Sequence, residues 1–332
     1  MTSTRTVAVQ DLLNRAKDSS ELSDLVKICN QLNEGSRIHI DEGTILYNIE
    51  DDLRVATGGD ACLLKQVGTV RKVFLEAFNE GKAPRPYYAV ILADGDGMGT
   101  FLDSFADPEG HKEFSGILSG FSGSCEATVK EHHGLFVYSG GDDVLALCPV
   151  GTCLTLAQEL HERFNTAMGS YPEDRRPTLT VAVAICPIND DLQDCIAYAH
   201  RLEKSKKGVQ GKDALVLGAR VRSGSDHGVA ISWKCGPVTA LDNLLKGYQN
   251  DWLPRGFGGD VMQLASLFEA FDANESHIGS EYDVLCEKKV SSENSEFLKG
   301  LLRDEWRNPN GLRLLAELLA VAHFMSRRGG EA

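Results

Sequence analysis

The segment 135–147 constrains the fold more than any other part of this sequence. It reads Leu-Phe-Val-Tyr-Ser-Gly-Gly-Asp-Asp-Val-Leu-Ala-Leu, with apolar residues on both sides of a polar centre. Two apolar runs of strand length joined by a turn sequence predict a β-hairpin. Gly140 and Gly141 permit positive φ and let a bulky ligand approach the backbone. Asp142 and Asp143 place two carboxylates at this tip, which favours a divalent cation.

A second pair of carboxylates follows a predicted buried strand. The run 87–93 is continuously apolar and ends in Asp-Gly-Asp-Gly-Met-Gly, which contains Asp94 and Asp96. An uninterrupted apolar run of this length is typical of a central strand that opens into a glycine loop.

The order of predicted elements indicates an α+β fold. After the strand at 87–93 come a helix at 111–132, the hairpin, a helix at 152–168, a strand at 178–185, a helix at 191–206 and a strand at 214–217. A hairpin between two crossover helices predicts a ferredoxin-like sheet with helices on one face.

Three regions follow from this pattern. Residues 1–86 are a helical connecting region with apolar residues at helical spacing, which ends in the proline-containing linker 81–86. Residues 87–220 form the domain that contains this sheet. Residues 221–332 follow a turn-rich boundary at 220–228, and helical periodicity predicts a carboxy-terminal helical bundle there.

Composition limits the class of protein. The formal charge of −14 argues against a chain that coats nucleic acid by itself, because phosphate neutralisation needs a basic surface. The nine cysteines show no C-x-x-C and no zinc spacing, so reduced core thiols are expected. The amino terminus lacks the apolar h-region of a signal peptide, and no run approaches the ~18 apolar residues of a membrane span, which predicts a soluble cytoplasmic protein without membrane contact.

The two acidic pairs predict a metal site if the sheet is ferredoxin-like. The first strand and the hairpin are then neighbours, so the carboxylates converge and need a cation to relieve their repulsion. Hard oxygen ligands suit Mg²⁺ or Mn²⁺, and two such ions favour phosphoryl transfer from a triphosphate. Asp94, Asp96, Asp142 and Asp143 are therefore all candidate ligands of a catalytic metal. The alternative is structural, because Gly-Asp pairs are common in surface turns.

Two other motifs are excluded. A calcium loop beginning at Asp94 would place Met98 at the fifth ligand position and Phe105 where the twelfth-position Glu belongs. The segment 208–213, Gly-Val-Gln-Gly-Lys-Asp, lacks both the spacing of a P-loop and its Ser or Thr.

A basic segment in this acidic protein suggests a nucleotide. Five cations lie between residues 201 and 212, namely Arg201, Lys204, Lys206, Lys207 and Lys212. We expect Lys206 to reach the triphosphate, although cations also suit the carbonyl end of any helix. Ser115, Ser119 and Ser122 are candidates to line the base pocket, with helix packing as their alternative function.

These motifs closely resemble the large polymerase/cyclase subunit of type III CRISPR effector complexes, particularly the Cmr type. The resemblance lies in Asp-Gly-Asp-Gly-Met-Gly after an apolar strand, in the helix from His111 and in the Gly-Gly-Asp-Asp hairpin. The segments 201–206 and 222–224 fit the same pattern, and the match covers roughly residues 60–330. Residues 87–220 would be the Gly-Gly-Asp-Asp palm of such a subunit, and this palm is more remotely similar to diguanylate cyclases and class III nucleotide cyclases.

The resemblance implies a function. Such subunits convert ATP to cyclic oligoadenylates with Mg²⁺ or Mn²⁺ when their complex binds target RNA. Their helical carboxy-terminal domain contacts small subunits and the guide–target duplex, so other effector subunits, guide RNA and target RNA are expected partners. By position Asp94, Asp142 and Asp143 would be the metal ligands, with Asp96 secondary, because only one residue of a D-x-D pair needs to point inward.

The sequence also departs from the family. Full-length members usually carry an HD nuclease domain, a first palm and often a zinc-binding insert, whereas here only short predicted helices precede residue 87. Without a His-Asp dipeptide, no HD-type DNase activity is expected. The family draws on two palms, so this chain is expected to be truncated or split, or to need a second palm in trans or a homodimer. A structural subunit of the ribonucleoprotein and a free-standing cyclase remain the alternatives.

Overall fold

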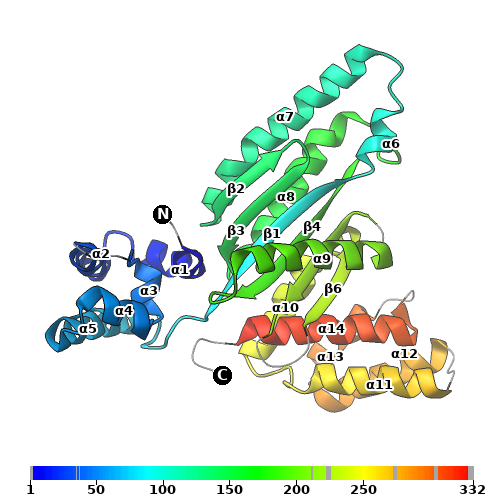
Figure 1. The fold of residues 1–332 in the computed structure, drawn as a ribbon. Coiled ribbons are helices and arrows are strands. Elements are labelled where there is room, and N and C mark those ends of the chain that lie inside the picture. The colour runs from blue at the N-terminus through cyan, green and yellow to red at the C-terminus, as the bar shows by residue number, and fades with distance from the viewer. Residues whose placement is uncertain are drawn as a thin grey trace. The chain divides into compact units, whose positions relative to one another are not determined.

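A computed structural model describes residues 3–34, 36, 38–210, 212–221, 226–271, 275–302 and 306–327, and the side chains of 205–210, 275 and 276 lie outside this set. Contacts divide the chain into two compact units, Met1–Arg201 and Leu202–Arg327. Figure 1 shows the elements of each unit along the colour ramp. The division falls inside a helix, before the predicted boundary near residue 220, and the predicted three-region organisation stays a prediction.

Unit 1 begins with five helices and continues into a sheet with its covering helices. The amino-terminal helices are α1 (Thr4–Arg15), α2 (Ser20–Asn33), α3 (Glu42–Leu46), α4 (Glu50–Thr57) and α5 (Ala61–Phe78). The sheet region contains β1 (Tyr87–Asp96), α6 (Met98–Leu102), α7 (Pro108–Glu131), β2 (Leu135–Gly140), β3 (Asp143–Pro149), α8 (Cys153–Ala167), η1 (Met168–Ser170) and β4 (Thr178–Pro187). Helix α9 (Leu192–Gln210) crosses the division.

The amino-terminal helices form because their apolar residues recur at helical spacing and their starts are capped. In α2, Leu25, Ile28 and Leu32 are buried on one face, and the Ser19 hydroxyl accepts a hydrogen bond from the Leu22 amide at 3.0 Å. Asp60 caps α5 in the same way. The buried faces meet in one apolar core that extends from Val9 to Leu75. The helical structure predicted for residues 1–86 is thus present, although the sequence analysis did not single out α3 or α4.

The sheet of unit 1 has the predicted ferredoxin-like topology. Its strand order is β2-β3-β1-β4, and β1 pairs antiparallel with both β3 and β4. Helices α7 and α8 pack against each other, α7 contacts β2 and α8 contacts β4 (Figure 1). The predicted adjacency of the first strand and the hairpin is confirmed by this order, and so is the α+β fold class.

Strand β1 is longer than the sequence predicts. We expected it to end at Ala93, but it continues through Asp96 because Asp94 and Asp96 pair with Thr180 and Thr178 of β4. Pairing with a strand far away in the sequence extends β1 into residues that by themselves resemble a loop. Asp94 and Asp96 therefore both lie on β1 and not beyond its end.

Unit 2 is mainly helical but is not the pure bundle that the sequence predicts. It contains β5 (Ala214–Ala219), β6 (His227–Ser232), η2 (Trp233–Cys235), α10 (Pro237–Gln249), α11 (Phe257–Phe271), α12 (Glu275–Lys289), α13 (Ser292–Leu301) and α14 (Pro309–Ser326). Strand β6 pairs antiparallel with β5, in the region interpreted as a turn-rich boundary. Its central residues are buried on both faces, so the sequence shows no alternation of apolar and polar residues. Helix α14 packs against α10, α11 and β6.

The cysteines are core residues, as expected. All nine are free thiols and seven are buried, with Cys62 exposed and Cys235 intermediate. Burial raises the pKa of Cys29 and of Cys153 to about 12, which keeps these thiols protonated and unreactive at neutral pH. Within the described residues, no helix has the length and apolar content that crossing a bilayer requires.

Candidate active site on the palm sheet

Three strands bring the acidic motifs into one row across the sheet. Gly140 of β2 lies directly opposite Asp143 of β3, and Asp94 of β1 lies opposite Thr180 of β4. The last pair between β1 and β3 is Ala93 with Val144, so the same register continued by one residue places Asp94 opposite Asp143. Directly opposed residues in antiparallel strands share a face. Asp94 and Asp143 therefore project to the same side of neighbouring strands.

The turn between β2 and β3 consists of Gly141 and Asp142. Gly141 has φ of 72°, the left-handed conformation that the first loop position of a type II′ turn requires. A Cβ on Gly141 would meet nothing within 4 Å, so this position is glycine for its backbone conformation and not for lack of space. The predicted hairpin with a tight glycine turn is present, and its tip is open.

The carboxylate of Asp142 lies against β1. A Cβ built on Gly95 would overlap Asp142 Oδ2 and lie 2.7 Å from Asp142 Cβ, so only glycine at position 95 leaves room for this side chain. Because side chains alternate along a strand, Gly95 faces the side opposite to Asp94. Asp142 is therefore on the face of the sheet toward which Gly95 is directed, whereas Asp143 is on the face of Asp94. The two carboxylates approach β1 from opposite faces at the hairpin tip. The sequence analysis did not single out Gly95.

Asp96 is held by the neighbouring strand. It is only 3% exposed, and its Oδ2 accepts hydrogen bonds from Thr180 Oγ1 at 2.7 Å and from Thr178 Oγ1 at 3.1 Å. Asp94 and Asp142 are half-buried by comparison, and Asp143 is exposed. Of the two residues in the D-x-D pair, Asp94 is the more accessible at the tip.

The chemical type of these side chains suits a hard divalent cation. Asp94, Asp142 and Asp143 offer only carboxylate oxygens, the ligands that Mg²⁺ and Mn²⁺ prefer. Among the described residues, however, no three His, Cys, Asp or Glu side chains are grouped closely enough to hold a metal ion. The structure places these carboxylates on adjacent elements without assembling them into a closed site. Their assignment as metal ligands stays a prediction.

The other predicted ligand-binding residues are less informative. Ser115 is exposed on α7 and donates to the His111 carbonyl at 2.8 Å, and Ser122 shares a hydrogen bond of 2.9 Å with Ser139 of β2. The side chain of Lys206 and the segment 222–224 lie outside the described residues. Arg201, Lys204 and Lys212 are exposed. The assignments of Ser115 and Lys206 to nucleotide binding therefore stay predictions.

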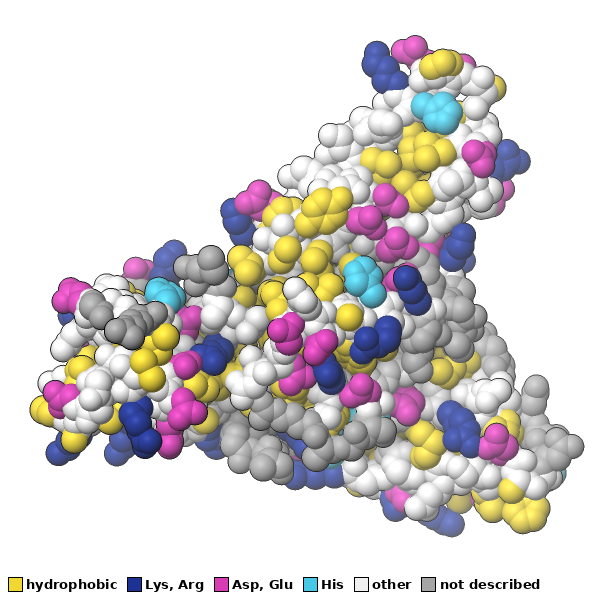
Figure 2. Space-filling view, viewed as in Figure 1, with side chains coloured by type: hydrophobic (Ala, Val, Ile, Leu, Met, Phe, Trp, Pro, Cys, Tyr) yellow, Lys and Arg dark blue, Asp and Glu magenta, His cyan; other side chains and the backbone are white. Residues whose placement is uncertain are grey.

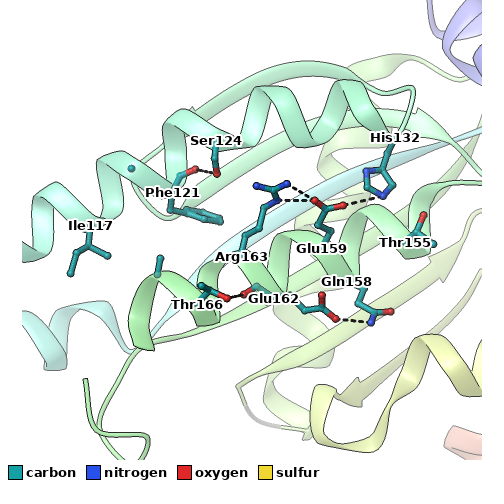
Figure 3. Close-up of a pocket in the computed structure, with 12 residues that line it drawn as sticks. Ile117, Phe121, Ser124, His132, Thr155, Gln158, Glu159, Glu162, Arg163 and Thr166 are labelled. Atoms are coloured by element: carbon teal, nitrogen blue, oxygen red, sulfur yellow. Dashed lines mark hydrogen bonds and ion pairs between the residues drawn. The ribbon is translucent and has the colours of Figure 1, made fainter. Parts of the chain in front are cut away.

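A separate groove of about 910 Å³ runs between α7 and α8. Its floor includes Phe121 and Ile117, and its polar groups bind one another (Figure 3): Glu159 accepts from Arg163 Nε at 2.8 Å and faces His132 Nε2 at 3.4 Å. None of the predicted site residues lines it. The groove is therefore distinct from the hairpin tip.

Charge on the visible surface is mixed. In the view of Figure 2, acidic and basic side chains alternate over the described surface, in keeping with an acidic chain that has a formal charge of −14. Such a surface does not favour broad, sequence-independent binding of nucleic acid.

Comparison with known proteins identifies the sheet region. Residues 87–216, which contain all four aspartates, match the family described as Cas10/Cmr2, second palm domain. A curated relative, the CRISPR system Cmr subunit Cmr2 of Pyrococcus furiosus, is 28% identical over 184 residues, which are 48% of this chain and 21% of the relative. The chain thus spans about a fifth of the length of the curated relative that it matches.

Solved structures show the same fold at low sequence identity. A type III-B Cmr-beta complex bound to cognate target RNA contains a chain with a TM-score of 0.54 and 12% identity, over 87% of this chain and 43% of that one. The Csm1–Csm4 subcomplex of the type III-A CRISPR-Csm interference complex gives a TM-score of 0.51 and 15% identity, over 73% and 36% of the two chains. The family match covers residues 87–216 alone, and this region, in which β1 to β4 have the ferredoxin-like order, is similar to the second palm domain of Cas10/Cmr2 proteins.

Proposed function

We propose that this chain is the nucleotidyltransferase palm of a type III CRISPR effector, which makes cyclic oligoadenylates from ATP when target RNA is bound. The observation that carries the proposal is the row in which Asp143 and Asp94 face each other on adjacent strands, with Asp142 against Gly95 beside them. Like charges directly opposite each other destabilise a sheet. Their presence at an open tip is expected where a bound cation offsets the repulsion.

The chain's own groups would hold the substrate and the ions. Asp94, Asp142 and Asp143 would bind two Mg²⁺ or Mn²⁺ ions, which would lower the pKa of an attacking ribose 3′ hydroxyl and stabilise the leaving pyrophosphate. The open turn at Gly141 leaves space for the triphosphate to approach the backbone. Arg201, Lys204 and Lys206 on α9 supply cations that suit a triphosphate. No side chain is required as a general base.

The proposed partners are the other subunits of the effector, guide RNA and target RNA, together with a second palm in trans or a second copy of this chain. A palm that shares its substrates with another palm is active only in that assembly. The chain therefore needs its partners in any assay.

The experiment combines the purified chain with its effector subunits, guide RNA, ATP and Mn²⁺, with and without complementary target RNA. We expect pyrophosphate release and 3′–5′ linked cyclic oligoadenylates, identified by mass spectrometry, only when target RNA is present. Chelation of the metal with EDTA should stop the synthesis. A complex that assembles and binds target RNA normally but releases no pyrophosphate would contradict the proposal.

A structural subunit is the second candidate function. It is favoured by the absence of a preassembled group of three metal-binding side chains among the described residues. On this alternative the palm serves folding and assembly, so the wild-type complex assembles normally and releases no product.

Gly95→Ala tests the position of Asp142 directly. The new Cβ would overlap the Asp142 carboxylate and lie 2.7 Å from Asp142 Cβ, so the side chain and the turn that carries it must both shift, and we expect some loss of stability. Product formation should fall roughly tenfold, because misplacement of a catalytic group by about 1 Å is costly. Gly123→Ala in α7 is the matched control, since its Cβ would meet nothing within 4 Å. Equal rates for both variants and wild type would show that Asp142 does not act from this position.

A further inference from the structure

Tyr138 is an exposed aromatic residue beside the hairpin tip. Its side chain is 54% exposed, and it lies on β2, the outer strand of the β2-β3-β1-β4 order, two residues before Gly140. The register between β2 and β3 shifts between Phe136 and Tyr138, so Val137 forms an irregularity just before it. After this irregularity, residues 138–140 pair regularly with β3.

The phenol of Tyr138 packs on the backbone of Gly140. A Cβ built on Gly140 would overlap Tyr138 Oη and Cζ, and it would lie 3.2 Å from Cε2. The hydroxyl end of the side chain, and not only its ring, therefore rests on the glycine. Glycine inside a strand weakens the strand and often marks the close approach of another group. Position 140 is thus glycine because Tyr138 fills the space of a side chain, whereas position 141 is glycine because its φ is positive.

The hydroxyl also faces the side of the sheet that carries Asp94 and Asp143. Ser139, between Tyr138 and Gly140, points toward α7, where it shares the hydrogen bond with Ser122. Because side chains alternate, Tyr138 and Gly140 face the opposite side, which Asp143 shares as the partner of Gly140. Adjacent strands lie about 4.8 Å apart, so the phenol is about one strand spacing from Asp143, and Asp94 is one strand further.

A phenol hydroxyl is a neutral donor among acceptor-only carboxylates. Carboxylates that hold divalent ions leave the outer phosphate oxygens of a nucleotide to be bound by hydrogen-bond donors. Tyr138 is held by its contact with Gly140, so its hydroxyl is positioned before any ligand arrives.

We infer that Tyr138 is a positioning residue for the nucleotide, and that its hydroxyl donates a hydrogen bond to a phosphate oxygen of a nucleoside triphosphate bound at the Asp94–Asp143 row. This inference rests on the proposed function of the palm. It adds a ligand contact that the acidic motifs do not contain, on the outer strand of the hairpin.

The test compares wild type with Tyr138→Phe, which keeps the ring on Gly140 and removes only the hydroxyl. The effector complex assembled with the full chain, guide RNA and target RNA is titrated with the α,β-methylene analogue of ATP in the presence of Mg²⁺, because this analogue is blocked at the bond that nucleotidyl transfer breaks. We expect Tyr138→Phe to weaken binding about tenfold, the effect of one lost hydrogen bond to a charged group. In the assembled complex KM for ATP should rise while kcat changes less than about twofold, because a contact made equally in ground and transition states affects KM alone.

Val137→Ala is the matched control. Val137 is 49% exposed on the same strand, and its replacement should leave binding of the analogue within about twofold of wild type. Thermal unfolding should be the same for wild type and Tyr138→Phe, which separates a ligand contact from a structural role.

The outcomes are distinguishable. Failure of wild type to bind the analogue with Mg²⁺ would overturn both the proposed function and this inference. Binding by wild type together with equal binding by Tyr138→Phe would overturn this inference alone. Weak binding by Tyr138→Ala with normal binding by Tyr138→Phe would assign the effect to the ring and contradict the hydrogen bond.

Discussion

Replacement of both Asp142 and Asp143 with alanine will reduce oligoadenylate synthesis about 10³-fold or more without loss of thermal stability. Both carboxylates lie at the open tip, one against Gly95 and one in the row with Asp94. Their removal leaves the charge of the triphosphate without metal ions to offset it, and loss of even one electrostatic contact of this kind typically costs 10²- to 10³-fold in rate. The melting temperature should not fall, because Asp143 and Asp94 repel each other across the strands.

The measurement is pyrophosphate release by the assembled complex with target RNA, ATP and Mn²⁺, together with the melting temperature of the free chain. The control removes the same charge elsewhere in unit 1. Glu173 and Asp174 are adjacent exposed acids in the loop before β4, and the double alanine variant there should synthesise product at the wild-type rate. A hairpin whose acids only build the turn would give the opposite pattern, with lower stability and no specific loss of synthesis.

Gly43→Ala will destabilise the amino-terminal helices by about 3 kcal/mol, the upper end of what overpacking costs. Gly43 lies in α3 where that helix crosses the start of α1, and a Cβ there would overlap Arg5 C and lie 2.5 Å from Thr6 N. These are backbone atoms, so no rotamer change relieves the overlap and α1 must move away from α3. The buried side chains between the two helices, including Val9 and Ile45, would then lose contact.

Urea denaturation followed by circular dichroism measures this effect. Gly68→Ala provides a control of opposite sign, because Gly68 lies inside α5 and its Cβ would meet nothing within 4 Å. Alanine is favoured over glycine in a helix by about 0.5–1 kcal/mol, so Gly68→Ala should raise the free energy of unfolding. If Gly43→Ala unfolds at the same urea concentration as wild type, α1 and α3 do not approach as closely as described.

The sequence was sufficient to predict that the two acidic motifs lie next to each other. Each pair follows or joins strongly apolar strands, and the order of elements allows few sheet topologies, so the adjacency of Asp94 and the hairpin could be predicted. The buried Asp96 was less predictable. Its burial depends on hydroxyls from Thr178 and Thr180, which lie more than 80 residues away and pair with β1 only in the folded sheet.

Contacts between backbone and side chain were also invisible in the sequence. Gly95, Gly140 and Gly43 each lack a side chain because another residue occupies the space, yet in the sequence they resemble ordinary loop or turn glycines. Strand β6 was missed for a related reason, because its burial on both faces removes the alternation by which strands are recognised. The sequence does show that Tyr138 and Gly140 are two residues apart and so share a face of their strand. Only the register between β2 and β3 shows that Asp143 shares this face.

The packing of Tyr138 on Gly140 has a consequence for how these positions can vary during evolution. A side chain at 140 would occupy the space that the Tyr138 phenol now fills, so a larger residue at 140 is expected together with a rotated or smaller side chain at 138. Position 141 is independent of this pair, and it admits asparagine or aspartate, which tolerate positive φ. The two neighbouring glycines of one motif are therefore expected to covary with different partners.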